Sequence, residues 1–202
     1  MAGPKGREAV EAALVRAAAD VLAEEGPRNA GLREIAKRAE VNHGQVHHYF
    51  GSKDALLRAA MRHLALEHFT NATARAHGGS LPAPLTLTED ARYWQAVIRL
   101  VLDGELDIAR IEVDEDISVP RRALHTLAHA LGQDEPDLEL KSRVAASVAL
   151  QLAWAALEEF VFAVTDVEPD EEAAVRAHVA NVSVRILAPL DRDEPVATGG
   201  AR

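Results

Sequence analysis

Residues 32–57, LREIAKRAEVNHGQVHHYFGSKDALL, decide the predicted fold. The first part of this stretch carries apolar residues at helical spacing, namely Leu32, Ile35, Ala36 and Ala39. Asn42 is a preferred N-cap residue, which predicts a second helix from His43 to Tyr49. Ser52 is another preferred N-cap residue, so a third helix is expected to begin directly after it. Two short helices joined by a tight turn, with a third behind them, are typical of a helix-turn-helix.

The second helix of this motif is rich in side chains that can form hydrogen bonds with DNA. A helix-turn-helix places this helix in the major groove, where Gln can pair with adenine and His can contact guanine or phosphate. Gly44 has no side chain, so it permits close approach to a sugar-phosphate strand. Lys53 is expected beside free backbone amides at a helix start, which suits phosphate. The predicted DNA-binding residues are Arg33, Asn42, His43, Gly44, Gln45, His47, His48, Tyr49 and Lys53.

The motif resembles the DNA-binding domain of the TetR (AcrR) family of transcriptional regulators. The resemblance covers about the first sixty residues and rests on Ile35-Ala36, Ala39, Val41, Gly44, Tyr49-Phe50, Ser52-Lys53 and Leu56-Leu57. Three positions depart from the family pattern, because Gly31 replaces a capping Thr or Ser, Glu40 a Gly and His47 a frequent Tyr. The resemblance implies a homodimeric regulator, most often a repressor, that binds a small effector within its C-terminal helices.

The composition limits the class of protein. The 202 residues are 48% hydrophobic but only 4% aromatic, and alanine is abundant, which favours an all-α fold over β-sheet. Cysteine is absent, which excludes disulfides and cysteine-ligated metals. We recognise no signal segment or membrane-spanning run, which predicts a cytoplasmic protein without a membrane partner. No Ser-His-Asp spacing, P-loop or dinucleotide glycine motif is recognised, so we expect neither catalysis nor a cofactor.

The net charge of −10 argues at first against a DNA partner, because affinity for DNA depends on neutralising phosphates. The charge is unevenly distributed along the chain. Residues 1–58 contain nine Lys and Arg against eight Asp and Glu, a net charge of +1, whereas residues 59–202 contain 13 against 24, a net charge of −11. We therefore expect the acidic part to face away from DNA and non-specific binding to be modest at physiological salt.

The chain is expected to have three parts. Residues 1–58 would form the helix-turn-helix DNA-binding domain, residues 59–190 an effector-binding and dimerisation domain, and residues 191–202 a disordered tail. Helices are predicted over 9–25, where Gly26-Pro27 would end the helix, and over 52–76, 89–102, 105–113, 119–131, 137–165 and 169–188. Residues 77–84 are expected to be a flexible connector. The helix over 52–76 would be shared by both domains and could act as a lever.

The helices predicted over 137–165 and 169–188 are apolar on more than one side. The first has one stripe formed by Val144, Val148, Leu152 and Ala155, and most of its other faces are also apolar. The second has a stripe formed by Val175, Val179, Val182 and Ile186. A helix buried on two faces needs two partners, so we expect this pair to pack against its copy in a second subunit. A monomer that buries both faces internally is the alternative.

A small-molecule pocket is expected in the C-terminal domain. The predicted effector-binding residues are Trp94, Arg99, Asp103, His125, His129 and Trp154, although ordinary core packing is the alternative for each one. The sequence does not indicate which effector is bound. A helix-turn-helix protein that binds a partner protein instead of an effector is a further alternative, which a C-terminal core without a cavity would favour.

A metal-dependent enzyme or metal sensor is the second functional hypothesis. It would use His125, His129 and the acidic stretch Glu112 to Asp116, which is otherwise expected to be a solvated loop or helix end. His43 and His47 are also four residues apart, as in some zinc sites. No acidic residue follows His43 as in an HExxH motif, so DNA contact is the favoured role of this pair.

Overall fold

The computed structural model describes residues 4–76 and 90–188. This part of the chain contains ten helices and no strand, which confirms the predicted all-α class. The helices are α1 (Arg7–Asn29), α2 (Leu32–Arg38), α3 (His43–Phe50), α4 (Lys53–Arg75), α5 (Ala91–Leu102), α6 (Leu106–Ala109), α7 (Ile111–Asp114), α8 (Val119–Ala130), α9 (Leu138–Val164) and α10 (Glu172–Leu187). The predicted connector over 77–84 and the predicted tail over 191–202 lie outside the described residues.

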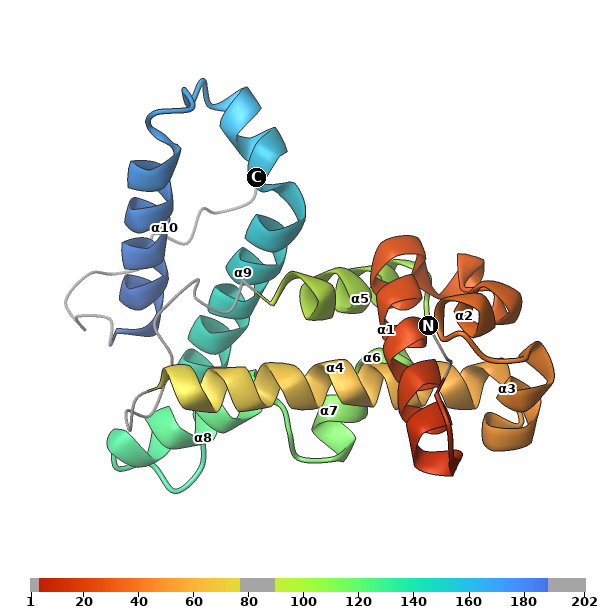
Figure 1. Ribbon diagram of the computed structural model, residues 1–202. Helices are drawn as coiled ribbons and strands as arrows, with labels where there is room; N and C mark the ends of the chain where they lie inside the picture. Colours follow the sequence, from red (N-terminus) through yellow and green to blue (C-terminus); the bar gives the residue numbers. More distant parts are fainter. Residues whose placement is uncertain (1–3, 77–89, 189–202) are drawn as a thin grey trace, which may run out of the picture.

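Helices α1, α2 and α3 pack with the first half of α4 at one end of the molecule (Figure 1), and we call this unit the N-terminal bundle. Its core is made of fully buried side chains: Leu14, Leu22, Ile35, Val46 and Leu56. The turn between α2 and α3 has the expected form. The amide of Val41 donates to the carbonyl of Ala36 over 3.0 Å. Glu40 adopts a positive φ of 55°, a conformation that glycine adopts at lower cost.

Helix α1 bends at Gly26, which has φ 78° and ψ 171°. The sequence predicts that the helix ends here, but a further turn continues to Asn29. Proline suits the first position of a helical turn, because its φ is fixed and its missing amide needs no acceptor there. Gly26-Pro27 is therefore a joint between two helical segments as well as the end of the first one.

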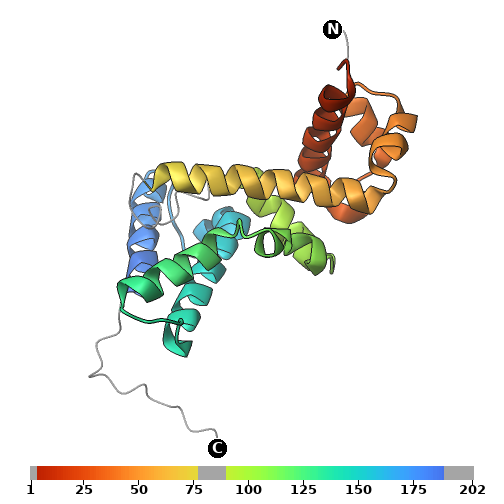
Figure 2. The ribbon, with the colours of Figure 1, turned by 90° about the horizontal axis from the view of Figure 1, so that it is seen from below.

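Helix α4 runs from the N-terminal bundle to the far end of the molecule (Figure 2). The larger buried core extends from α1 to α6, and so crosses the domain boundary that the sequence suggests at residue 58. Leu100 of α5 and Ile108 of α6 belong to this core and are at most 1% exposed. A second, smaller core joins α8 and α9 through Ala128, Leu140 and Val144. Helix α5 thus packs on α1 and α4, and α9, which contacts α8 and α10, also packs on α5.

Helices α9 and α10 expose large apolar side chains. On these two helices the exposed ones are Leu138, Leu157, Phe160, Val164, Val182 and Val184. Helix α9 has an 18-residue window with a mean hydropathy of 1.5, of which only 17% is buried. By length and composition alone, α9 could cross a membrane, contrary to the sequence expectation. A core helix of a soluble protein can have the same length and composition.

Candidate DNA-binding surface

Two N-caps hold α3 and the start of α4 in place. The Oδ1 atom of Asn42 accepts a hydrogen bond from the amide of Gly44 over 2.9 Å. The Oγ atom of Ser52 accepts one from the amide of Ala55 over 3.1 Å. Both caps agree with the prediction from sequence. Val46 is 1% exposed and anchors α3 in the N-terminal bundle, so the opposite face of α3 points outward.

The outward face of α3 carries polar side chains and a glycine. His43, Gly44, His47 and His48 are exposed, while Gln45 and Tyr49 are half-buried. The rings of His43 and His47 meet edge to face, with centroids 5.6 Å apart. The Nδ1 atom of His47 lies 3.3 Å from the carbonyl oxygen of Gly51. Because a carbonyl only accepts, Nδ1 carries the proton in this contact, which leaves Nε2 for another partner.

Arg33 and Lys53 are the basic residues of the predicted set. The Arg33 side chain is exposed on α2. Lys53 is half-buried, and its Nζ atom donates to the carbonyl of Arg28 over 3.3 Å. An ammonium group has three donors, so this hydrogen bond still leaves capacity for a phosphate. The guanidinium of Arg7 lies 6.0 Å from the ring centroid of Tyr49.

Arg38, in contrast, is engaged within the N-terminal bundle. Its guanidinium forms ion pairs with Glu24, Glu25 and Glu34 at 2.5, 3.0 and 3.0 Å. The hydrogen bonds that Arg38 donates to Glu24 and Glu34 raise its pKa above the usual value. The guanidinium of Arg38 thus links α2 to α1, so it is less available to DNA than the guanidinium of an unpaired arginine.

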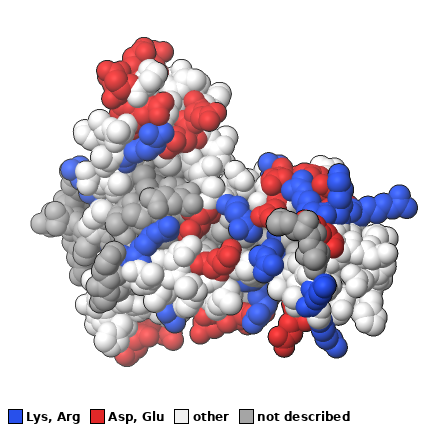
Figure 3. All heavy atoms as spheres, in the orientation of Figure 1, with Lys and Arg blue, Asp and Glu red and all other residues white. Residues whose placement is uncertain are grey.

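The surface of α3 carries no formal charge from Lys, Arg, Asp or Glu, because its sequence is HGQVHHYF. In Figure 3 the corresponding end of the molecule is accordingly white, with Lys and Arg side chains on the neighbouring helices. Helix α3 can therefore donate and accept hydrogen bonds without strong charge. Such a helix suits contact with base edges, and the basic neighbours suit contact with phosphates.

The predicted effector residues do not come together in the described structure. Arg99 and Asp103 lie against α1: the Nε atom of Arg99 donates to the carbonyl of Ala23 over 2.8 Å. His125 and His129 are exposed on α8. The two tryptophans are buried in different places, as Trp94 packs against His68 and Tyr93 and Trp154 against Phe162.

The metal hypothesis finds no support in the described residues. Within residues 4–76 and 90–188, no group of three or more His, Cys, Asp or Glu side chains is placed to hold a metal ion. The acidic stretch lies at a helix end with Asp114 to Asp116 exposed, as predicted, but Glu112 turns inward. Glu112 accepts hydrogen bonds from the hydroxyl of Tyr93 and, over 2.8 Å, from Ser118. Burial raises the pKa of Glu112, although both hydrogen bonds oppose that shift.

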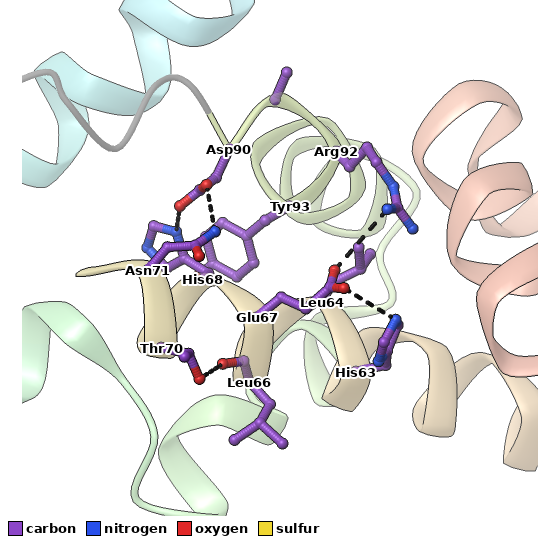
Figure 4. Close-up of a pocket in the computed structure, with 11 residues that line it drawn as sticks. His63, Leu64, Leu66, Glu67, His68, Thr70, Asn71, Asp90, Arg92 and Tyr93 are labelled. Atoms are coloured by element: carbon purple, nitrogen blue, oxygen red, sulfur yellow. Dashed lines mark hydrogen bonds and ion pairs between the residues drawn. The ribbon is translucent and has the colours of Figure 1, made fainter. Parts of the chain in front are cut away.

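A buried polar cluster between α4 and α5 was not predicted from the sequence (Figure 4). His68 is 1% exposed, and its Nδ1 atom lies 2.9 Å from Oδ2 of Asp90. Its ring stacks on Tyr93 with centroids 4.0 Å apart. These residues border a pocket of about 590 Å³. His68 follows Met61 and Leu64 at helical spacing, so the periodicity of α4 contained the signal that this histidine is buried.

The fold and this surface define a class of protein. A buried bundle that presents a capped polar helix behind a tight turn is a helix-turn-helix unit of a transcriptional regulator. Residues 14–60 match the family model of bacterial regulatory proteins of the tetR family. The HTH-type transcriptional repressor Rv3405c of Mycobacterium tuberculosis (strain ATCC 25618 / H37Rv) is 32% identical over 192 residues, which cover 92% of this chain and 93% of that protein. The chain belongs to the TetR family, whose members are DNA-binding transcriptional regulators and not enzymes.

Solved structures share the fold over nearly the whole chain. A tetR-family transcriptional regulator from Streptomyces coelicolor superposes with a TM-score of 0.59 at 21% identity, covering 95% of this chain and 94% of that one. A putative TetR-family regulator from Rhodococcus sp. superposes with a TM-score of 0.57 at 17% identity, covering 89% of this chain and 98% of that one. At these identities the likeness concerns the fold alone.

Proposed function

We propose that this regulator is a cytoplasmic homodimeric repressor that binds a palindromic operator and is released from it by a small effector. The observation that carries the DNA-binding part is the geometry of α3, which is anchored by buried Val46 and exposes polar side chains on its other face. The mycobacterial relative that covers nearly the whole chain is described as a repressor, which supports that direction of regulation. In a dimer, two copies of α3 would enter successive major grooves about one helical turn apart.

Gln45 and Lys53 should have different roles on DNA. Gln45 lies on α3, so Gln45→Ala should relax the preference at one operator position at a cost of about 1 to 3 kcal/mol. Lys53 lies at the start of α4, so Lys53→Ala should weaken binding evenly across sequences and lower the salt slope by about one. Selection from random DNA, followed by salt titrations of the selected sequence, measures both effects.

The matched control for this experiment is Gln95→Ala, which removes an exposed glutamine of α5. This variant should retain the sequence preference and the salt slope of the wild type. A Gln45→Ala protein that selects the same sequences with the same stringency would contradict the assignment of α3 to base contacts.

The dimer is proposed to form through α9 and α10. Leu157, Phe160 and Val164 are spaced three and four residues apart on α9, so they share one exposed face, and they are 49%, 63% and 60% exposed. Val182 of α10 is 49% exposed. Val144 and Val148 lie on another face of α9 and pack in the smaller core. One face of α9 is therefore used inside the subunit, and the exposed face is proposed for the dimer. Large exposed apolar surfaces on a soluble chain are typical of interfaces, and a two-fold axis would cover the same face on both copies.

The effector is proposed to act by changing the relative position of the two α3 helices. Helix α4 supports this coupling, because it begins beside α3 and continues to the opposite end of the molecule. The effector must bind the DNA-free form more tightly, by the same factor by which it weakens DNA binding. Trp94 and Trp154 are the only tryptophans, so quenching of their fluorescence is a screen for candidate effectors.

A further inference from the structure

Two side chains, Arg99 of α5 and Asp103 at its C-cap, contact α1 on either side of its kink at Gly26. The Nε atom of Arg99 donates to the carbonyl of Ala23 over 2.8 Å. Arg28 donates from Nη2 to the carbonyl of Asp103 over 3.3 Å, and its Nε atom lies 3.4 Å from the Asp103 carboxylate. We call this group of contacts, formed by Arg99 and Asp103 with Ala23, Gly26 and Arg28 of α1, the clasp.

The sequence Gly26-Pro27 makes the clasp possible. In a continuous helix, the amide of residue 27 would donate to the carbonyl of Ala23, but proline has no amide hydrogen. Arg99 supplies the missing donor to that carbonyl. Helix α5 and its C-cap approach Gly26 closely, because a Cβ atom at this position would contact Oδ2 of Asp103 at 3.4 Å and Cβ of Arg99 at 3.5 Å. The kink of α1 and the position of α5 are therefore linked.

The clasp continues to the start of α4. Arg28 contacts Asp103 through its side chain and accepts a hydrogen bond from Lys53 through its carbonyl, at 3.3 Å. The path from α5 to Lys53 thus consists of one ion pair, one residue of α1 and one hydrogen bond. It does not pass along α4, so it is independent of the lever proposed above.

We propose that Arg99 and Asp103 are positioning residues for DNA binding. They fix the last turn of α1, and this turn fixes Lys53 at the DNA-facing end of α4, although neither residue touches DNA. The inference rests on the proposed phosphate contact of Lys53. A displacement of α5 then changes the DNA-binding surface through α1.

Asp103→Lys tests this proposal, because charge alone and the clasp predict opposite results. The substitution replaces a negative charge with a positive one, which by general electrostatics would strengthen binding to DNA. In the clasp, the new ammonium group repels Arg28 and releases the support of Lys53. We therefore expect the affinity for DNA selected by the wild-type protein to fall about tenfold, and the salt slope to fall by about one as for Lys53→Ala. Fluorescence anisotropy with the selected duplex at several salt concentrations measures both quantities.

Three further variants complete the test. Asp134→Lys makes the same charge change at an exposed position between α8 and α9, and it should not weaken binding. Arg28→Glu combined with Asp103→Lys restores an ion pair with reversed polarity at the wild-type net charge. This double variant should recover the affinity and the salt slope. If Asp103→Lys fails to fold, Asp103→Asn tests the proposal instead, because it weakens the ion pair with Arg28 without adding repulsion. Its affinity and salt slope should fall in the same direction.

The outcomes separate this inference from the proposed function. A wild-type protein that selects no DNA sequence overturns the DNA-binding surface itself. A wild type that binds normally, with a folded Asp103→Lys variant that binds as tightly or more tightly, overturns the clasp alone. A folded double variant that keeps the salt slope of Lys53→Ala overturns it as well.

Discussion

Replacement of His68 by Phe should remove an acid-sensitive part of the protein's stability. His68 is 1% exposed, stacks on Tyr93 and contacts Asp90. Its Nε2 atom is buried without a hydrogen-bond partner among the described residues. Burial lowers the pKa of His68 below 6.5, an effect larger than the opposing contribution of the hydrogen bond to Asp90. Phe retains the stacking on Tyr93 but cannot bind a proton, while Asn71 continues to donate to Asp90.

The sign of the effect follows from proton binding by the two states. Below pH 6.5 the unfolded chain binds a proton at position 68 before the folded chain does, so the free energy of unfolding falls with acidification. The fall begins near pH 6.5 and ends at the lower pKa of the folded state. Its steepest slope is about 1.4 kcal/mol per pH unit for one proton, and each unit of pKa lowering contributes about 1.4 kcal/mol in total.

Neighbouring groups also titrate, and their effects must be separated from that of His68. The pKa of Glu112 is raised by burial, so the folded state binds this proton more tightly and stability falls as pH rises from 4.5 to the pKa of the folded state. Arg75, which also lies near Asp90, stays charged throughout this range. Since the wild type and His68→Phe share these groups, the difference between their unfolding free energies isolates His68.

Urea denaturation at fixed protein concentration, between about pH 5.5 and about pH 8, measures this difference through tryptophan fluorescence. The wild type should lose stability relative to His68→Phe as the pH falls. The control His178→Gln removes an exposed histidine of α10 and should follow the wild-type curve. A difference between wild type and His68→Phe that stays constant over this range would refute the reasoning.

Two other predictions concern α1 and the dimer. Gly26→Ala and Gly104→Ala both place alanine at a positive φ, 78° and 85°, which costs about 1 to 2 kcal/mol each. Only Gly26 lies in the clasp, where a Cβ atom would contact Oδ2 of Asp103 at 3.4 Å, whereas nothing lies within 4 Å of a Cβ atom at Gly104. A backbone shift that relieves the positive φ therefore displaces the clasp only in Gly26→Ala, so DNA titration should show the larger loss for this variant, and equal losses would contradict the clasp. Val182→Glu should split or unfold the dimer, because it buries an unpaired charge in the proposed interface. Light scattering should show a dimer for the control Leu131→Glu, and an unaffected Val182→Glu dimer would exclude α10 from the interface.

Local features of the fold could be predicted from the sequence. The caps at Asn42 and Ser52 lie where expected, and α3 ends at Phe50 instead of Tyr49. The other predicted helix ends agree within a few residues, except at α1 and over 105–113, because helix periodicity and capping depend on neighbours in the sequence. The single helix predicted over 105–113 is wrong, since the structure has two short helices there, α6 and α7. The joint at Gly26 departs from the prediction because Pro27 both ends one helical segment and begins another.

The long-range contacts could not be predicted in the same way. Leu100 of α5 is buried, but helical periodicity does not show which helix covers each side of α5. Sequence position suggests a cavity role for Arg99 and Asp103, which follow Trp94 in the same helical segment, whereas the structure places them against α1. The acidic neighbours of Glu112 suggest a solvated stretch, whereas Tyr93 supplies a buried donor.

The acidic excess of residues 59–202 also has a structural role that net charge did not reveal. Asp103 pairs with Arg28, and Asp107 of α6 pairs with Arg58 of α4. Both arginines count toward the net charge of +1 in residues 1–58, yet each pairs with a carboxylate from the acidic part of the chain. Exposed ion pairs of this kind are weak in stability terms. In the proposed complex with DNA, these ion pairs would leave fewer cations of residues 1–58 to neutralise phosphates. The sequence-independent part of the affinity would then be small, and the uncharged face of α3 would have a larger share in recognition.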